Sequence, residues 1–279
     1  MDASLSPGLY IVATPIGNLG DITLRAIATL RGVAAVACED TRVTGKLLHH
    51  LEIKQRLIRY DDHASDATRD YILALAAEQP VALVSDAGTP LISDPGFKLV
   101  RAARESGIAV TSLPGPSAAI MALTLAGLPS DRFLFAGFPP PARAARMRFL
   151  EDLRDVQATL VLYDSPKRVA ALLVDAAAAL GGGRQAAVCR ELTKRFEEVR
   201  RGTLAELAEE FAAEEVRGEI VVVIDRGTAT VADAATWEEA LDRAMETLSV
   251  KDAAAMVAEA YGLPRRDVYQ VALGRGKGR

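Results

Sequence analysis

Short apolar segments alternate with helical patterns over most of this 279-residue chain, and this alternation constrains the fold more than any other feature. Short apolar runs bounded by glycine or proline indicate buried strands, whereas apolar residues every three to four positions indicate a helix. The first series of expected strands is 9–13, 34–38, 57–60, 81–84 and 108–112, with helices at 23–31, 43–50, 66–78 and 96–106. Such alternation favours an α/β domain with a mostly parallel sheet.

A second series of expected strands follows, at 133–138, 159–163, 186–190, 197–201 and 219–224. Thr203 and Glu206 have the spacing of a capping box and predict a helix between the last two of them. The glycine and proline residues from Leu113 to Pro116 mark the expected boundary between two α/β halves. We therefore predict one domain at 1–115 and another at 116–231, with a cleft between them.

The last segment, 232–279, contains no expected strand and instead carries helix start and stop signals. Thr236 and Ser249 open the first two helices, the first ending near Leu248 and the second at Gly262, and Pro264 begins a third that ends near Gly274. Three short helices with a tight corner predict a helix-turn-helix-like appendage. A plain helical cap on the second domain is the alternative.

The charge of the chain limits how it could meet a nucleic acid. The net charge is −4, so a nucleic-acid partner would have to contact local basic patches. Aromatic residues make up only 5% of the chain, and stacking platforms for single strands are therefore not predicted. Three basic clusters qualify, with a solvated surface as the alternative for each: Arg143, Arg146 and Arg148; Arg195, Arg200 and Arg201; and Arg275, Lys277 and Arg279.

Several well-known motifs are missing from the sequence. No G-x-G-x-x-G follows the first strand, and neither a Walker A loop nor a G-x-S-x-G elbow occurs. The histidines (His49, His50 and His63) and the two cysteines do not form a metal-binding pattern. Cys38 and Cys189 lie inside apolar runs and are expected to be small core residues. With no signal peptide and no apolar run of about 20 residues, we expect a soluble, cytoplasmic protein.

Three loops rich in glycine and proline each follow an expected strand, at 14–19, 85–96 and 113–117. Loops at the carboxyl ends of parallel strands are where open α/β sheets bind ligands. Glycines let the backbone approach a ligand closely, and prolines fix the loop. Within the second loop, Asp94 and Pro95 have the pattern of a helix N-cap followed by proline. The sequence therefore predicts a ligand site at this edge of the first sheet.

The loops at 13–22 and 85–96 resemble those of the tetrapyrrole methylase superfamily, in particular its branch of small-subunit ribosomal RNA methyltransferases. Supporting segments in the same order are 38–42, 113–117, 127–133 and 190–194. The likeness extends from about Gly8 to Ile224, and the helical tail fits the same branch. One segment departs: the branch often has His-Asn-Glu where this chain has His63-Ala64-Ser65 after Asp62, so a role of that acidic position is not carried over.

The resemblance implies a two-domain class III methyltransferase fold, with S-adenosylmethionine in the cleft between the halves and a helical appendage at the end. It also implies a homodimer. The positions that it assigns to the cofactor are Ile16, Gly88, Thr89, Pro90, Ile92, Ser117, Ala118, Tyr163, Gly218, Glu219 and Ile220. The implied reaction is methylation of a ribose 2′-hydroxyl on a cytidine in the decoding centre of 16S ribosomal RNA, within the small ribosomal subunit.

Methyl transfer is an in-line displacement, for which the protein mainly aligns the reactants. A ribose hydroxyl is a poor nucleophile at neutral pH, so a nearby base should accept its proton. Candidates at or just beyond strand ends are Glu39, Asp40, His63, Glu191 and Lys194, each with helix capping or ion pairing as the alternative role. Candidates for contacts with RNA are Arg42, Arg143, Arg146, Arg148 and Lys194.

Two other functions fit the sequence. Methylation of a tetrapyrrole or another small molecule would keep the cofactor and change the acceptor; the acidic net charge favours it, whereas the basic clusters and the helical tail favour RNA. A ribosome-assembly factor without catalytic activity would use the cleft only as a scaffold. Co-purification with a coloured macrocycle would identify the first, and cofactor binding without methyl transfer would identify the second.

Overall fold

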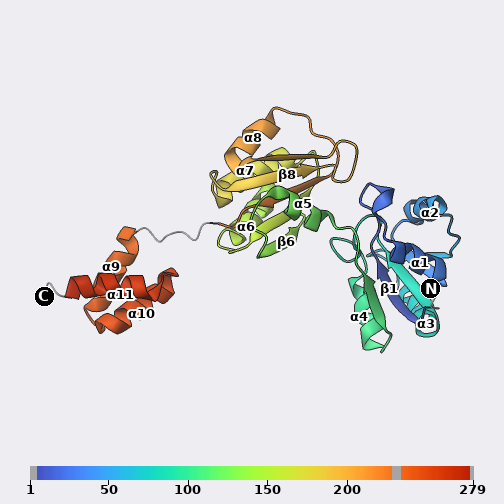
Figure 1. The fold of residues 1–279 in the computed structure, drawn as a ribbon, viewed down its shortest axis with the longest axis horizontal. Helices are drawn as coiled ribbons and strands as arrows, with labels where there is room; N and C mark the ends of the chain where they lie inside the picture. The colour runs from blue at the N-terminus through green and yellow to red at the C-terminus, as the bar shows by residue number, and fades with distance from the viewer. Residues whose placement is uncertain (1–4, 228–233, 277–279) are drawn as a thin grey trace.

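The computed structural model describes residues 5–227 and 234–276, and it contains two α/β domains, each built on a five-stranded sheet (Figure 1). Every pairing in the first sheet is parallel, as the sequence predicts. Its strands lie in the order β3 (Leu57–Arg59), β2 (Ala35–Cys38), β4 (Pro80–Val84), β1 (Gly8–Val12) and β5 (Val110–Leu113). The carboxyl ends of all five strands therefore lie at one edge.

Four helices cover the two faces of the first sheet. They are α1 (Leu24–Gly32), α2 (Thr41–His50), α3 (Asp66–Glu78) and α4 (Phe97–Glu105). Side chains from α1 and α2 pack on one face and those from α3 and α4 on the other. The side chains of Thr23 and Ser65 cap α1 and α3, which start close to where the sequence predicts. Helix α2 starts two residues early because Asp40 caps it by accepting the N–H of Arg42.

The start of α4 corrects a sequence-based prediction. Asp94 is not its N-cap: Gly96, with φ of 134°, occupies that position, and no side chain caps the helix. The loop before it is unusual, because Leu91 and Ser93 both adopt positive φ values of 75° and 60°. A residue with a side chain is strained at positive φ, and packing by the surrounding structure must offset this cost. Asp94 is therefore released from capping and lines a cleft instead.

The second sheet is mixed, and here the structure differs from the first domain. Its order is β6 (Phe133–Gly137), β7 (Thr159–Asp164), β10 (Ile220–Ile224), β8 (Gln185–Arg190) and β9 (Glu198–Thr203). Only β6 and β7 pair in parallel, and the other neighbours are antiparallel. Residues at the end of one strand consequently meet residues at the start of the next, as Asp164 of β7 does with Ile220 of β10.

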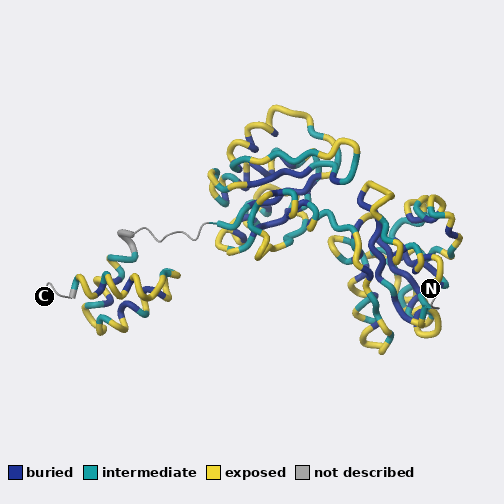
Figure 2. Tube along the Cα trace, in the orientation of Figure 1, coloured by how far each residue is buried: buried dark blue, intermediate teal, exposed yellow. Residues whose placement is uncertain are grey.

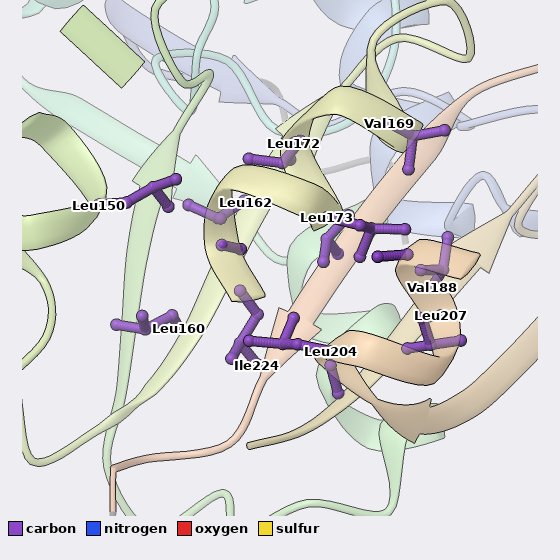
Figure 3. Close-up of a cluster of buried hydrophobic side chains, with 14 of the residues drawn as sticks. Leu150, Leu160, Leu162, Val169, Leu172, Leu173, Val188, Leu204, Leu207 and Ile224 are labelled. Carbon is purple, nitrogen blue, oxygen red and sulfur yellow. The ribbon is translucent and has the colours of Figure 1, made fainter. Parts of the chain in front are cut away.

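Helices also cover both faces of the second sheet. One face carries α6 (Arg143–Asp152), α7 (Val169–Leu180) and α8 (Leu204–Ala212), whose leucines fill the core in Figure 3. The other face is covered by α5 (Ala118–Ala126), the helix that connects the domains. The capping box at the start of α8 is present as predicted, between Thr203 and Glu206. The predicted boundary at 115 and 116 lies between β5 and α5 and stays a prediction.

The last three helices have a hydrophobic core of their own. They are α9 (Ala234–Met245), α10 (Val250–Tyr261) and α11 (Arg265–Gly276), and apolar residues from all three pack together. Ser249 caps α10 and Gly262, with φ of 64°, ends it, as predicted. Helix α9 begins before Thr236, whose side chain lies outside the described residues, as do Lys277 and Arg279. Arg275 joins α11 to Glu238 and Asp242 of α9.

Buried residues follow the strands of both sheets and the inner faces of their helices (Figure 2). Cys38 and Cys189 are free and buried, as the sequence predicts. In the part of the chain that the structure describes, no helix is long and apolar enough to span a membrane.

Candidate functional site

The three loops predicted to form a site are joined to one another at the edge of the first sheet. Thr14 and Gly88 exchange backbone hydrogen bonds of 2.9 and 3.0 Å. The hydroxyl of Thr89 donates to the carbonyl oxygen of Pro116 over 2.9 Å. Gly88 has φ of 80°, a conformation that favours glycine. The loops at 14–19, 85–96 and 113–117 are thus joined into one rim.

A cleft of about 370 Å³ opens beside this rim, between the two domains. Its volume lies within the range of small-molecule sites. The first domain contributes Ile16, Ala87, Gly88, Thr89, Ile92, Ser93 and Asp94, and α5 contributes Ala118 and the preceding Ser117. The second domain contributes Phe138, Tyr163, Asp164, Ser165, Pro166, Gly218, Glu219, Ile220 and Val221.

The residues that the resemblance assigns to the cofactor come together in this one cleft. Every position that it assigns to the cofactor is in the lining except Pro90. The same reasoning missed Asp94, which it treated as a helix cap, and Phe138, which follows β6. It also missed Asp164 to Pro166, which continue from Tyr163 at the end of β7. A carboxylate directly after an apolar strand was the available signal for Asp164.

The charged residues that line the cleft are all acidic. Its lining carries the carboxylates of Asp94, Asp164 and Glu219, and among the described lining residues none is Lys, Arg or His. Glu219 is paired outside the cleft with Lys194, over 3.1 Å. Asp94 makes no hydrogen bond or ion pair with any described residue, and burial, followed by nearby carboxylates such as Glu39 and Asp86, raises its pKa to about 7. The cleft therefore suits a positively charged ligand.

Asp164 is a second carboxyl group in the lining of the cleft. Its side chain is almost fully buried; Oδ1 pairs with Arg168 over 2.8 Å and accepts the N–H of Ser165 over 2.7 Å. The other oxygen, Oδ2, is buried and has no hydrogen-bond partner among the described residues. Burial raises the pKa of this carboxyl, although Ser165 and Arg168 oppose the shift. A buried acceptor without a partner costs free energy, so this carboxyl is destabilised in its ionised form.

A second cavity of about 750 Å³ adjoins the cleft, with Ser93 and Asp94 in the lining of both. It contains three of the predicted catalytic candidates, Glu39, Asp40 and His63, together with the predicted RNA contact Arg42. The structure thus gathers four separately predicted residues beside the cleft. No group of His, Cys, Asp and Glu in the described chain is arranged to hold a metal ion.

Two neighbouring carboxyl groups in the second cavity differ in basicity. Burial, followed by the negative charge of Asp86, raises the pKa of Glu39. Hydrogen bonds from Arg42 lower the pKa of Asp40 far below its ordinary value. Asp40 also caps α2, so its carboxylate is already engaged. Of the two, Glu39 is the better proton acceptor near neutral pH.

The other catalytic candidates, Glu191 and Lys194, lie in the loop between β8 and β9. Lys194 Nζ is 2.8 Å from Glu191 Oε1 and 3.1 Å from Glu219 Oε2. Although burial opposes it, these hydrogen bonds raise the pKa of Lys194, which keeps the ammonium charged. A charged ammonium held by two carboxylates is neither a base nor an available phosphate contact.

Lys194 instead lies where the two domains touch. Its aliphatic carbons cover Gly17, such that a Cβ on Gly17 would lie 2.5 Å from Lys194 Cγ. The preceding residue, Ile16, packs into the core of the second domain together with Leu192. Glu191 and Thr193 adopt positive φ values of 51° and 67° in this loop. The first loop of one domain is thus seated on a strained loop of the other, directly beside the cleft.

The arginines of the basic clusters differ in burial and in pairing. Arg146 is buried and pairs with the buried Asp175 over 2.7 Å, so it belongs to the interior and not to a surface for RNA. Arg143 and Arg148 on the same helix are exposed, although Arg143 also reaches Asp175. In the second cluster, Arg200 pairs with three glutamates and Arg201 donates to backbone carbonyls of α5. Arg42 is exposed and pairs with Asp40.

Comparison with protein families gives two matches. The model described as Tetrapyrrole (Corrin/Porphyrin) Methylases matches residues 8–208. A second, described as RsmI C-terminal HTH domain, matches residues 231–276, which agrees with the predicted helix-turn-helix-like appendage.

Comparison with individual proteins gives relatives over nearly the whole chain. A "Ribosomal RNA small subunit methyltransferase I" of Erythrobacter litoralis is 54% identical over 269 residues, covering 96% of this chain and 95% of that protein. The protein of the same name from Mesorhizobium japonicum is 48% identical, covering 95% and 91%. Among solved structures, a uroporphyrin-III-C-methyltransferase from Thermus thermophilus superposes with a TM-score of 0.56 at 22% identity, covering 78% of this chain and 94% of that one.

Proposed function

The chain belongs to the tetrapyrrole (corrin/porphyrin) methylase family, within its ribosomal RNA small subunit methyltransferase I group, and we propose that it methylates a ribose 2′-hydroxyl of a cytidine in 16S ribosomal RNA. The methyl donor in this proposal is S-adenosylmethionine, bound in the cleft between the domains. The acceptor is the small ribosomal subunit or its RNA, which places the activity in the cytoplasm. The homodimer implied by the resemblance is part of the same proposal.

One observation carries the cofactor assignment: the cleft is lined by carboxylates and by no described basic side chain. S-adenosylmethionine has a sulfonium and an ammonium group against one carboxylate, so its net charge is positive. Asp94, which has no partner among the described residues, can face this charge. The cofactor, when bound, supplies an activated methyl group.

The protein's own residues would then orient the acceptor and take its proton. We place the acceptor in the second cavity, because that cavity meets the cleft at Asp94. Glu39 is assigned as the proton acceptor, since its raised pKa makes it a stronger base than an ordinary carboxylate. Arg42, Arg143 and Arg148 are exposed cations that can contact phosphates, whereas Arg146 and Lys194 are engaged inside the protein.

The decisive experiment is transfer of a labelled methyl group from S-adenosylmethionine to small subunits that lack the modification, with naked 16S RNA in parallel. Label at one cytidine that protects the adjacent bond from alkali would establish ribose methylation. Replacing Glu39→Gln should lower kcat about 100-fold or more while cofactor affinity is retained. Cofactor binding without label on either RNA substrate would contradict the proposal and direct the search to a macrocycle or to a role without catalysis.

A further inference from the structure

Phe138 is an exposed aromatic residue in the lining of the cleft. The residue is 57% exposed and lies in the cleft between the domains. Among the large exposed apolar residues of the described chain, only Ile92 does the same. Leaving an aromatic ring exposed to water costs free energy relative to burying it. An exposed ring at a binding site therefore suggests a role in binding.

An irregular backbone conformation directly before Phe138 sets the direction of its side chain. Strand β6 pairs with β7 through a bulge between Phe135 and Gly137. Gly137 has φ of 70°, a left-handed conformation in which a side chain would be strained. Bulges next to functional sites commonly change the direction in which the following side chain points. The next residue after this bulge is Phe138.

The ring is also held on one side. Phe138 and Tyr163 are in an edge-to-face arrangement with centroids 5.5 Å apart, and Phe135 lies 4.8 Å from Tyr163 on the same pattern. Tyr163 is itself fixed, because its hydroxyl accepts the N–H of Ala119 at the start of α5 over 3.0 Å. Three aromatic rings thus form a ladder that runs from the inside of the second domain to the mouth of the cleft.

Buried charges hold the segment that follows Phe138. Arg146 donates to the carbonyl oxygen of Pro141 over 3.0 Å, and Arg168 donates to that of Pro139. Each guanidinium is in turn fixed by a buried carboxylate, Asp175 for the first and Asp164 for the second. A proline segment fixed at two carbonyls has little freedom to fold Phe138 away from solvent. The exposed ring is therefore preorganised.

We propose that Phe138 is a stacking platform for an unpaired nucleobase of the acceptor RNA at the mouth of the cleft. This inference rests on the proposed function. It adds the side chain that would hold a nucleotide of the RNA at the cleft. Single-stranded bases stack on exposed aromatic rings, which is the usual way in which proteins hold a nucleotide out of its helix. Composition alone, with few aromatic residues, gave no sign of such a platform.

The RNA base fits the ring better than the cofactor does. A small ligand buries most of its own surface inside a cleft of this size. Phe138 is 57% exposed, so a macromolecular substrate can reach its ring.

The test compares Phe138→Ala, Phe138→Trp and Phe97→Ala with the wild-type enzyme, using unmodified small subunits as the RNA substrate. Phe97 is the matched control, because its side chain is 64% exposed on α4 but does not line the cleft. Phe138→Ala should raise KM for the RNA about 5- to 100-fold, as expected for the loss of one stacked base. Phe138→Trp should retain most of the activity, and Phe97→Ala should behave as wild type.

Two further readouts separate stacking from other roles. Calorimetry should show a much smaller loss of S-adenosylmethionine affinity than of RNA affinity for Phe138→Ala. The salt dependence of RNA binding should keep its slope because no phosphate contact is lost. The proposal is overturned if Phe138→Ala methylates RNA like the wild type, or if its cofactor affinity falls as much as its RNA affinity. Absence of transfer by the wild type itself would instead refute the proposed function.

Discussion

The two walls of the cleft are built by different means. The wall from the first domain consists of loops after parallel strands, held by backbone hydrogen bonds such as those between Thr14 and Gly88. The wall from the second domain comes from β7, β10 and the segment after β6, and buried ion pairs such as Arg146 with Asp175 hold it. One wall depends on glycine conformations, and the other depends on charges in the interior.

This difference explains why the two walls were not equally visible in the sequence. A parallel sheet places the carboxyl ends of all its strands at one edge, so loops that are far apart in the chain can be assigned to one site. In the second sheet β7 and β10 run in opposite directions, and Asp164 at the end of one meets Ile220 at the start of the other. No rule based on strand ends brings those two together.

The largest effect is expected from removing the support of the second wall. Arg146→Ala leaves the buried carboxylate of Asp175 with only the exposed Arg143, which should lower the free energy of unfolding by about 3–5 kcal/mol. Urea denaturation measures the change. Arg148→Ala, on the exposed side of the same helix, should change it by less than about 0.5 kcal/mol. Equal losses in the two variants would show that the wall does not depend on the buried pair.

The next effect concerns the point where the walls touch. A Cβ at Gly17 would lie 2.5 Å from Lys194 Cγ, so Gly17→Ala should displace the two loops and weaken both stability and cofactor affinity. Lys194→Ala removes the colliding atoms, and the double variant should recover part of the loss. We expect a coupling free energy of about 1–3 kcal/mol from the four proteins of this cycle, measured by calorimetry and denaturation. Additive effects would mean that the loops do not touch in solution.

The first wall should be sensitive to backbone conformation. Gly88→Ala places a side chain at φ of 80° and should cost about 1–2 kcal/mol of stability, with a loss of cofactor affinity. Gly107→Ala is the control: its φ is 73°, yet no atom of the described residues lies within 4 Å of the added carbon, and it is outside the cleft. Both variants should be destabilised alike in thermal melts, but only Gly88→Ala should bind the cofactor more weakly.

The smallest effect concerns the charge of the first wall. Because its pKa is raised to about 7, Asp94 is about half protonated at neutral pH, and a cationic ligand favours the ionised form. Binding should therefore release a proton at lower pH, and affinity should increase as the pH rises toward 7 and level off above it. Between pH 6 and pH 7.5 the ionised fraction rises from about a tenth to about three quarters, which predicts a gain of about eight-fold.

The comparison for this pH dependence is Asp94→Asn, measured in the same buffers so that titration of the ligand cancels. The variant should bind more weakly and should lose the proton release. If wild type and variant keep the same pH profile, then Asp94 does not face the charge of the ligand.

The sequence by itself determined the alternation that gives two α/β domains and the parallel pairing of the first sheet. It also determined the capping box at Thr203 in the second domain and the helical tail with its cap at Ser249. These features are local, since periodicity, caps and glycine-rich loops act within one turn or one strand. The family likeness then supplied residues of the second wall that local patterns do not reveal. Helices α6 and α7 were missed, the latter because an almost uniformly apolar helix has no polar face to give a period.

Only the tertiary structure decided what individual polar residues do. Arg146 and Arg148 are two positions apart and equivalent in sequence, yet one is buried on Asp175 and the other is exposed, because successive helix positions face different directions. Asp94 has the pattern of a cap, but Gly96 takes that position and leaves the carboxylate to the cleft. Charge pairing and burial depend on which distant segments meet, and this is a property of packing, not of spacing along the chain.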